Sequence, residues 1–296
     1  MIIKSMNNQK LISVIIPCYN QYESLMIVLR SFSNQSLNKN KFEIIVVDDG
    51  SSDDTVKIDS NFLFERFGIY GQVIHTINQG RAKARNVGIN KSISKYICFC
   101  DGDRFVAPTF LEEHIKCHQK GQNIVIGCPM DYYGNTRILK YDNFNWNHIN
   151  KLSRVNEYFK KIETIYTNNK TNSNLAWLSF LVGNSSVSKR LLELVHGFNE
   201  NFVEWGFEHF ELALRMQEVE KDFYLNKLAL SYHIPHKREN NFYEIRINQN
   251  INILKTMHTN INEDVMAKIL LNNININECE NVIFLEEKNE QKSFYE

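Results

Sequence analysis

Near-continuous apolar runs alternate with amphipathic stretches along the first half of the chain. Residues 11–17 form the first apolar run, and apolar side chains then recur at helical spacing between residues 23 and 32. Such a run is typical of a parallel strand covered on both faces, and the stretch after it predicts an amphipathic helix. The pattern repeats, with strands expected over 42–47, 72–77, 96–100 and 123–127, and helices over 55–67, 80–94 and 108–119. This alternation predicts right-handed βαβ units and an α/β fold with a doubly wound, mostly parallel, Rossmann-like sheet.

The pattern weakens between residues 130 and 174, where aromatic and asparagine residues are scattered among polar ones. We interpret this region as a variable segment that departs from the regular alternation of strands and helices. Further helices are expected near 155–165 and over 189–195, 207–219, 244–257 and 263–271. The pattern therefore divides the chain into residues 1–129, 130–238 and 239–296, the last part being a helical C-terminal extension.

Length and charge narrow the possible functions. The chain has 296 residues, of which 43% are hydrophobic, and this is enough for a sizeable core. Lys and Arg together number 34, as do Asp and Glu, so no overall field attracts nucleic acid or an anionic membrane. We therefore expect no nucleic-acid partner, and any site for a polyanion must be local.

Cysteine usage and the absence of long apolar segments indicate the compartment. The six cysteines show no C-x-x-C pairing, and at least Cys18, Cys98 and Cys100 fall in expected buried strands, as reduced core thiols do. The first ten residues are polar, and no stretch reaches the roughly 18 apolar residues needed to span a bilayer. These features predict a cytoplasmic protein without a transmembrane segment, which meets any membrane-bound partner only at the surface.

Polar groups gather where the expected strands end. They lie at Pro17–Asn20, Asp48–Asp49, Asn78–Arg85 and Asp101–Asp103. In doubly wound sheets, ligands bind beyond the carboxyl ends of the strands. The sequence therefore predicts one ligand site built from these four segments.

Asp101-Gly102-Asp103 follows directly after the expected strand at 96–100. Residues two apart in a strand point to the same side, so both carboxylates can converge on one hard cation. A divalent ion held in this way could neutralise a diphosphate. The alternative is a solvated turn, because Asp and Gly are ordinary turn formers.

Four motifs, in this order, resemble family 2 glycosyltransferases of the GT-A fold. They are Ser13-Val14-Ile15-Ile16-Pro17-Cys18-Tyr19-Asn20, Val46-Val47-Asp48-Asp49-Gly50-Ser51-Ser52-Asp53, Asn78-Gln79-Gly80 leading to Ala84-Arg85-Asn86-Val87-Gly88-Ile89, and Asp101-Gly102-Asp103. Three later motifs are similar to the galactosyltransferase-type C-terminal module of chondroitin polymerases and, more distantly, to polypeptide N-acetylgalactosaminyltransferases. These are Gly183-Asn184-Ser185-Ser186, Gly197-Phe198-Asn199-Glu200-Asn201-Phe202 and Trp205-Gly206-Phe207-Glu208-His209-Phe210-Glu211-Leu212. The resemblance covers about Ser13 to His236 and depends on the order and spacing of all the motifs.

The resemblance implies that residues 1–129 bind a nucleotide sugar and that residues 130–238 bind the acceptor and carry out catalysis. The implied activity is metal-dependent transfer of a hexose or N-acetylhexosamine from a UDP-sugar to a hydroxyl of a glycan, lipid-linked glycan or peptide. Inversion is favoured over retention. The sugar, the acceptor and the oligomeric state, including a homodimer, are left open.

The expected uridine site combines Pro17 and Tyr19 with the carboxylates of Asp48 and Asp49. A base needs a flat apolar surface and hydrogen bonds to its edge, which these side chains can supply. The alternative for residues 48–54 is an acidic turn, and for Ser51, Ser52 and Asp53 helix capping is the favoured interpretation.

The diphosphate is expected near the start of the helix at Gly80. Arg81 and Arg85 lie four residues apart on one face of this helix, and Asn78 precedes it. Arg85 matches the family pattern, whereas Arg81 is about equally consistent with a solvated surface role. Asp101 and Gly102 belong to the same donor site, with Asp101 expected at the ribose.

Asp101, Asp103 and His233 are the expected ligands of the metal ion, which is Mn²⁺ or Mg²⁺. The resemblance implies a third ligand beyond the Asp pair, and Tyr232-His233-Ile234-Pro235-His236 offers two imidazoles. We choose His233, with His236 as the open alternative. A nitrogen ligand favours Mn²⁺ over Mg²⁺.

The catalytic base is expected at the start of the helix at 207–219. Related modules carry Glu-Asp there, whereas this chain has Glu208-His209. Either His209 is the base, since imidazole accepts protons near neutral pH, or Glu208 is the base and His209 positions the acceptor. Trp205, Gly206 and Glu211 are expected to bind the acceptor, although Glu211 could instead interact with the helix dipole.

Two other functions compete with this interpretation. A non-catalytic nucleotide-sugar-binding or scaffold protein is supported only by the loss of the usual Asp at His209. A nucleotidyltransferase shares the α/β pattern, but no glycine-rich phosphate loop with a following lysine is present. The nucleotidyltransferase is the weakest of the three interpretations.

Overall fold

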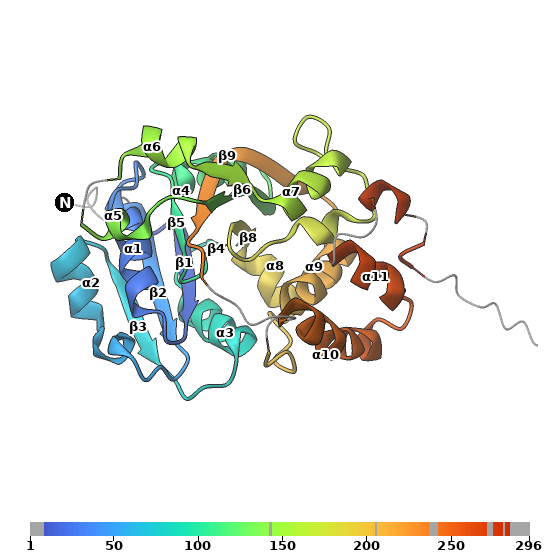
Figure 1. The fold of residues 1–296 in the computed structure, drawn as a ribbon, viewed down its shortest axis with the longest axis horizontal. Helices are drawn as coiled ribbons and strands as arrows, with labels where there is room; N and C mark the ends of the chain where they lie inside the picture. Colours follow the sequence, from blue (N-terminus) through green and yellow to red (C-terminus); the bar gives the residue numbers. More distant parts are fainter. Residues whose placement is uncertain are drawn as a thin grey trace, which may run out of the picture.

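One large sheet, with helices on both faces, organises the protein (Figure 1). The computed structural model describes residues 9–141, 144–204, 206–236, 242–270, 275–280 and 282–284. The strand order is β3-β2-β1-β4-β8-β6-β9-β5, and β7 pairs with β6. The expected α/β fold is confirmed.

The N-terminal half contributes the parallel part of the sheet. Its strands are β1 (Ile12–Cys18), β2 (Phe42–Asp48), β3 (Gly71–His75) and β4 (Tyr96–Phe99). β1 pairs in parallel with β2 and with β4, and β2 pairs in parallel with β3. The carboxyl ends of these strands therefore meet at one edge, as the apolar runs predicted.

Alternation along β1 divides the core between the two faces of the sheet. Val14 and Ile16 pack with α1 (Tyr22–Ser33), α2 (Ser60–Phe67) and α4 (Phe110–Gln119). Ile15 points to the other face and packs with Ala82 and Ile89 of α3 (Arg81–Lys91). A Cβ at Gly88 would lie 2.5 Å from the side chain of Ile15, so the glycine permits close packing of α3 on the sheet.

The strands after β4 extend the sheet, mostly through antiparallel pairs. The strands are β5 (Arg104–Val106), β6 (Ile124–Tyr132), β7 (Ser153–Val155), β8 (Ser185–Ser188) and β9 (Phe223–His233). β8 runs antiparallel to both β4 and β6, whereas β6 and β9 are parallel. β6 crosses the boundary expected at residue 129, so both halves share one sheet.

Two expected helices are shorter than their hydrophobic patterns suggested. The stretch 55–67 is divided into a 3-10 turn, η2 (Asp54–Lys57), and α2, because Asp53 and Asp59 each cap a separate start. The stretch 155–165 begins with the end of β7 and continues as α7 (Glu157–Ile162) and η3 (Glu163–Ile165). The remaining short elements before β8 are η1 (Lys39–Lys41), α5 (Thr136–Tyr141), α6 (Trp146–Lys151) and η4 (Ala176–Ser179).

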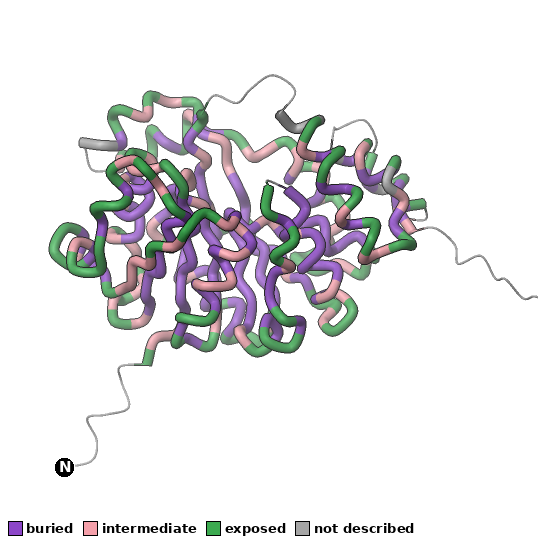
Figure 2. The backbone as a smooth tube through the Cα atoms, turned by 90° about the horizontal axis from the view of Figure 1, so that it is seen from below, coloured by how far each residue is buried: buried purple, intermediate pink, exposed green. Residues whose placement is uncertain are grey.

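The C-terminal extension is helical, as expected. After α8 (Lys189–Leu194) and α9 (Glu208–Val219), the chain forms α10 (Phe242–Met257), α11 (Glu263–Leu270) and η5 (Ile276–Glu278). Apolar side chains of the extension, including Ile251, Leu254 and Met266, join the core that lies on the α3 face. Figure 2 shows buried segments running through the interior and exposed turns at the rim. In the part of the chain that the structure describes, no helix is both long and apolar enough to cross a bilayer.

Candidate active site

The loops after β1 and β2 are held together by polar side chains. Asn20 adopts a left-handed backbone, with φ of 51°, and its Oδ1 accepts hydrogen bonds from the backbone N–H of Ser52 and Asp53. Asp53 accepts from Thr55 N and from Tyr22 N, at the starts of two helical segments. The capping role predicted for Asp53 is confirmed, and the two loops form one rigid edge.

Asp48 and Asp49 use their carboxylates within the protein. Asp48 is buried, with one oxygen accepting from Ser51 N at 3.0 Å and the other 2.8 Å from His75 Nδ1. Asp49 is also buried and accepts from the backbone N–H of Gln79 and Gly80, both at 2.9 Å. These contacts tie the β2 loop to the start of α3, and the expected contact with uracil stays a prediction.

The other expected donor residues differ in exposure. Tyr19 is 50% exposed, and Asn78 is also exposed, so both can contact a ligand at this edge. Pro17 is buried within β1, and Gly102 is buried against the side chain of Gln21 and the backbone of Pro17. Arg81 is half-buried at the first position of α3.

Arg85 is buried between carboxylates of the two halves. Its side chain is 1% exposed, Nη2 donates to Asp101 Oδ1 at 2.9 Å, and Nη1 donates to Glu208 Oε1 at 2.9 Å. The guanidinium also lies 5.5 Å from the ring centroid of Phe198. These contacts make Arg85 a bridge from Asp101 to Glu208 at the start of α9, and its expected contact with the diphosphate stays a prediction.

Asn86, which the sequence analysis did not select, links the halves beside Arg85. Its amide donates to Phe198 O at 2.8 Å and accepts from Phe198 N at 2.9 Å. The backbone of Val203 approaches Gly80 too closely to leave room for a Cβ there. Asn86 of α3 and Gly80 just before this helix thus hold the loop 197–204. In the sequence, the Arg85-Asn86 dipeptide was the available signal for this link.

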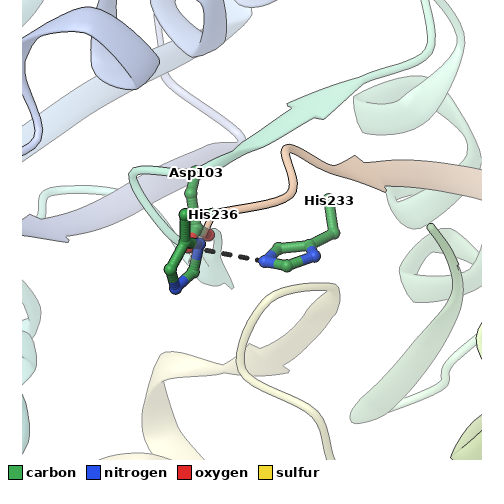
Figure 3. Close-up of side chains that lie close together, drawn as sticks. All are labelled: Asp103, His233 and His236. Carbon is green, nitrogen blue, oxygen red and sulfur yellow. Dashed lines mark ion pairs between the residues drawn. The ribbon is translucent and has the colours of Figure 1, made fainter. Parts of the chain in front are cut away.

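Asp103, His233 and His236 converge where β5 starts and β9 ends (Figure 3). Asp103 Oδ2 lies 3.7 Å from His233 Nε2 and 3.6 Å from His236 Nδ1. One ligand atom from each of the three residues lies within 4.8 Å of the other two. The structure therefore brings together both histidines that the sequence offered as alternatives.

Strand register explains how distant residues meet at this cluster. β5 pairs antiparallel with β9, so Arg104 lies opposite His233 and Asp103 precedes it directly. Burial alone would raise the pKa of Asp103, but His233, Arg104 and His236 together lower it to about 2. The Asp103 carboxylate is therefore ionised and available to a cation at neutral pH.

The donor set of this cluster fits a divalent cation. One ionised carboxylate and two imidazoles within a single cation's reach are oxygen and nitrogen donors that suit Mn²⁺ better than Mg²⁺. Asp101 was also expected to bind the metal, but it is not a member of this group of described residues. Its Oδ1 instead pairs with Arg85, and Oδ2 lies 4.0 Å from Arg104 Nε.

Glu208 and His209 begin α9 next to Arg85. Glu208 is 2% exposed, and its Oε2, which has no hydrogen-bond partner among the described residues, lies 3.7 Å from His209 Nδ1. Burial would raise the pKa of Glu208, but His209, Arg85 and Arg81 hold it well below its usual range. An ionised, Arg-paired carboxylate is a poor proton acceptor, so this geometry favours Glu208 as the group that orients His209.

The backbone just before α9 is unusual. Gly206 has φ of 107° and Phe207 has φ of 70°, a left-handed conformation that is uncommon for a bulky residue. Two consecutive positive φ angles turn the chain so that Glu208 enters the buried site. Trp205, expected to bind the acceptor, lies outside the described residues.

Glu211 lies between Arg215 and His258. Its carboxylate accepts from Arg215 Nε at 2.7 Å and from Arg215 Nη2 at 2.6 Å, and it lies 3.6 Å from His258 Nε2. Arg215 also donates to the backbone oxygens of Val195 and Gly197. These contacts favour a structural role for Glu211 over the expected acceptor contact.

Two protein families match successive parts of the chain. The family described as "Glycosyl transferase family 2" matches residues 13–175, and "N-terminal domain of galactosyltransferase" matches residues 164–237. The chain is 26% identical over 258 residues to the uncharacterized glycosyltransferase YfnE of Bacillus subtilis, covering 76% of this chain and 64% of that protein. It is 32% identical over 134 residues to the glycosyltransferase AglE of Haloferax volcanii, covering 45% of this chain and 41% of that protein. The chain thus spans less than two thirds of the length of these relatives.

Solved structures share the fold. A crystal structure of Staphylococcus aureus TarS in complex with UDP-GlcNAc matches with a TM-score of 0.61 and 17% identity, covering 89% of this chain and 71% of that chain. The mannosyltransferase PcManGT from Pyrobaculum calidifontis, in complex with GDP-Man and Mn²⁺, matches with a TM-score of 0.60 and 16% identity, covering 90% of this chain and 72% of that chain. At these identities the likeness shows the fold alone.

Proposed function

Because the chain belongs to glycosyl transferase family 2, we propose that it is a metal-dependent transferase that uses a UDP-sugar. The proposed reaction moves a hexose or N-acetylhexosamine to a hydroxyl of a glycan, lipid-linked glycan or peptide, with inversion at the anomeric carbon. The observation that carries the proposal is the convergence of Asp103, His233 and His236 beside the carboxyl ends of the parallel strands. Fold neighbours that hold UDP-GlcNAc, or GDP-Man with Mn²⁺, support the same type of donor and ion.

In this proposal, Asp103, His233 and His236 hold Mn²⁺. The bound ion supplies positive charge to the diphosphate of the departing nucleotide. Tyr19 and Asn78 are both exposed where the parallel strands end, and we assign them to the nucleotide. The buried carboxylates of Asp48 and Asp49 keep the surrounding loops in place for that contact.

The proposed base is His209, oriented by Glu208. With the Nδ1 proton directed at the Glu208 carboxylate, the lone pair of Nε2 is free to accept the proton of the acceptor hydroxyl. Arg85 keeps Glu208 ionised, so the carboxylate also stabilises the imidazolium that forms. A single base on the acceptor side is what direct, inverting displacement requires.

A donor screen tests the function. Purified protein is incubated with individual UDP-sugars and Mn²⁺, and UDP release is measured with and without EDTA. We expect turnover with at least one UDP-hexose or UDP-N-acetylhexosamine, and its loss in EDTA. UDP release that EDTA leaves unchanged would exclude the metal mechanism, and the absence of release with every donor and acceptor would favour the non-catalytic alternative.

The Asp103→Asn variant tests the site itself. Loss of a metal ligand should remove about 3 kcal/mol or more of transition-state stabilisation, which lowers turnover at least about 100-fold. Thermal unfolding is followed alongside, because the Asp103 carboxylate also stabilises the fold through His233, Arg104 and His236, and a variant that stays folded separates this cost from the loss of chemistry. Asp54→Asn is the matched control, because Asp54 is exposed and pairs with Lys57 at the surface, and it should leave both readouts unchanged.

A further inference from the structure

We propose that Asp131 is a positioning residue that fixes the orientation and tautomer of His233. Asp131 lies in β6 directly opposite His233 of β9 in the parallel register. Its Oδ1 is 3.9 Å from His233 Nδ1, whereas the other ring nitrogen, Nε2, lies 3.7 Å from Asp103. The imidazole therefore lies between two carboxylates, one at the cation cluster and one behind it.

The contacts of Asp131 explain why it can act as a fixed partner. Its second oxygen, Oδ2, accepts a hydrogen bond from Asn156 Nδ2 at 2.9 Å. Asn156 is itself anchored, because its Oδ1 caps α7 by accepting from Phe159 N. The Asp131 carboxylate is thus held at one end by the start of α7 and directs its other oxygen towards His233.

Imidazole ligands generally need such a partner. A histidine binds a cation through one nitrogen only when that nitrogen is unprotonated, and the hydrogen bond of the other nitrogen sets which tautomer is present. At 3.9 Å, the Asp131 carboxylate is an electrostatic neighbour of Nδ1 rather than a hydrogen-bond acceptor. Its negative charge favours the tautomer with the proton on Nδ1, in which the lone pair of Nε2 faces the cluster.

This inference rests on the proposed function, because it takes Asp103, His233 and His236 as the metal ligands. The groups that face His233 are Asp103 from the loop before β5, Asp131 from β6, and His236 beyond the end of β9. Arg104, opposite His233 in β5, instead lies near Asp101. Asp131 is the carboxylate on the Nδ1 side.

The test measures the affinity for Mn²⁺ directly. Free Mn²⁺ is followed by electron paramagnetic resonance during titration of the full chain, with and without saturating UDP. Asp131→Asn keeps the size of the side chain but removes its charge, and it should weaken Mn²⁺ binding about 10–100-fold. Asn156→Ser keeps an oxygen for the α7 cap, adds no charge and removes the amide that donates to Asp131, and it should weaken binding by a smaller factor.

A double-mutant cycle identifies the partner. In a His233→Ala background, Asp131→Asn should have no further effect on Mn²⁺ affinity, because the group it positions is absent. Asp54→Asn is the control for a lost surface carboxylate, and thermal unfolding confirms that each variant is folded. Equal effects of Asp131→Asn in the wild-type and His233→Ala backgrounds would overturn the positioning role.

The possible outcomes distinguish failure of this inference from failure of the proposed metal-dependent function. If Asp103→Asn and His233→Ala measurably weaken Mn²⁺ binding while Asp131→Asn binds as the wild type does, the metal site stands and the role of Asp131 is refuted. If the wild type binds no Mn²⁺ with or without UDP, both the metal-dependent function and the inference fail. If Asp131→Asn unfolds, Asn156→Ser replaces it in the cycle with His233→Ala, and the same outcomes decide the question.

Discussion

Arg85→Met should destabilise the protein more than an ordinary charge removal. The side chain is 1% exposed and forms two charge-assisted hydrogen bonds, one to Asp101 and one to Glu208. Methionine fills similar volume but leaves both carboxylates without their cation, and Glu208 is itself buried. The variant therefore isolates the cost of losing the ionic bridge between the two halves.

The expected magnitude follows from these contacts. Each hydrogen bond to a charged group is worth about 1.5–3 kcal/mol, and breaking a buried ion pair from one side costs about 3–5 kcal/mol. We expect a loss of about 3–5 kcal/mol in the free energy of unfolding. At about 2–4 °C per kcal/mol for a large domain, the midpoint of thermal unfolding should fall by about 6–20 °C.

Chemical denaturation and thermal unfolding measure the change. Arg190→Met, at an exposed position of α8, is the matched control and should change the free energy of unfolding by less than about 0.5 kcal/mol. The triple variant Arg85→Met, Glu208→Gln, Asp101→Asn removes the unpaired charges together with the cation. It should recover part of the lost stability, because the unpaired carboxylates account for much of the decrease in the free energy of unfolding.

Two results would refute this reasoning. If Arg85→Met unfolds within about 1 kcal/mol of the wild type, the guanidinium does not hold the halves together. If the triple variant is less stable than Arg85→Met, the cost does not come from unpaired carboxylates, and the packing of Arg85 against Phe198 becomes the better explanation.

Three further predictions test other contacts. Asn86→Ala should cost about 1–3 kcal/mol of stability, because it leaves the Phe198 backbone N–H and C=O without partners; an unchanged denaturation curve would contradict this. Gly80→Ala should lower the free energy of unfolding, because a Cβ at this position would clash with the backbone of Val203. Asp53→Ala should lower it by about 1 kcal/mol, because the N-cap of η2 is lost. The midpoints of thermal unfolding of Gly80→Ala and Asp53→Ala measure these two effects. Unchanged midpoints would show that the two loops tolerate the substitutions.

Buried histidines predict how stability depends on pH. Burial lowers the pKa of His114 to about 3 and that of His118 to about 4, so both stay neutral in the folded protein well below pH 6.5. The unfolded chain takes up these protons as the pH falls below about 6.5, so stability decreases from there down to about pH 4, by up to about 1.4 kcal/mol per pH unit for each group. Denaturation at pH 7, 6 and 5 measures the slope, and His118→Gln should flatten it; identical slopes would contradict the assignment.

The sequence predicted those strands and helices whose apolar residues form a continuous run or recur at helical spacing. β1 and β2 are apolar on both faces, so their runs identified them, and α1, α4, α9 and α10 carry apolar residues at helical spacing. β8 was not identified because Ser185-Ser186-Val187-Ser188 has no apolar run, and its buried serines are satisfied by partners such as His118 and Leu181. β5 and β7 contain three residues each and exist only through their neighbours in the sheet.

The order of motifs also led to the Asp pair, to His233 and His236, and to the start of α9, because chemically distinctive residues follow strand ends that must meet at one edge. Only the tertiary structure decided their partners. Arg85 and Glu208 are separated by 123 positions in sequence, Asn86 and Phe198 by 112, and Asp131 meets His233 through strand register. The sequence by itself determined which residues could bind a charged ligand, since this depends on the residue type and on the local spacing of side chains along a strand or helix. Whether a charged side chain faces a ligand or another side chain depends on which distant segment packs against it. Only the tertiary structure, in which residues far apart in sequence share one sheet, shows which segment that is.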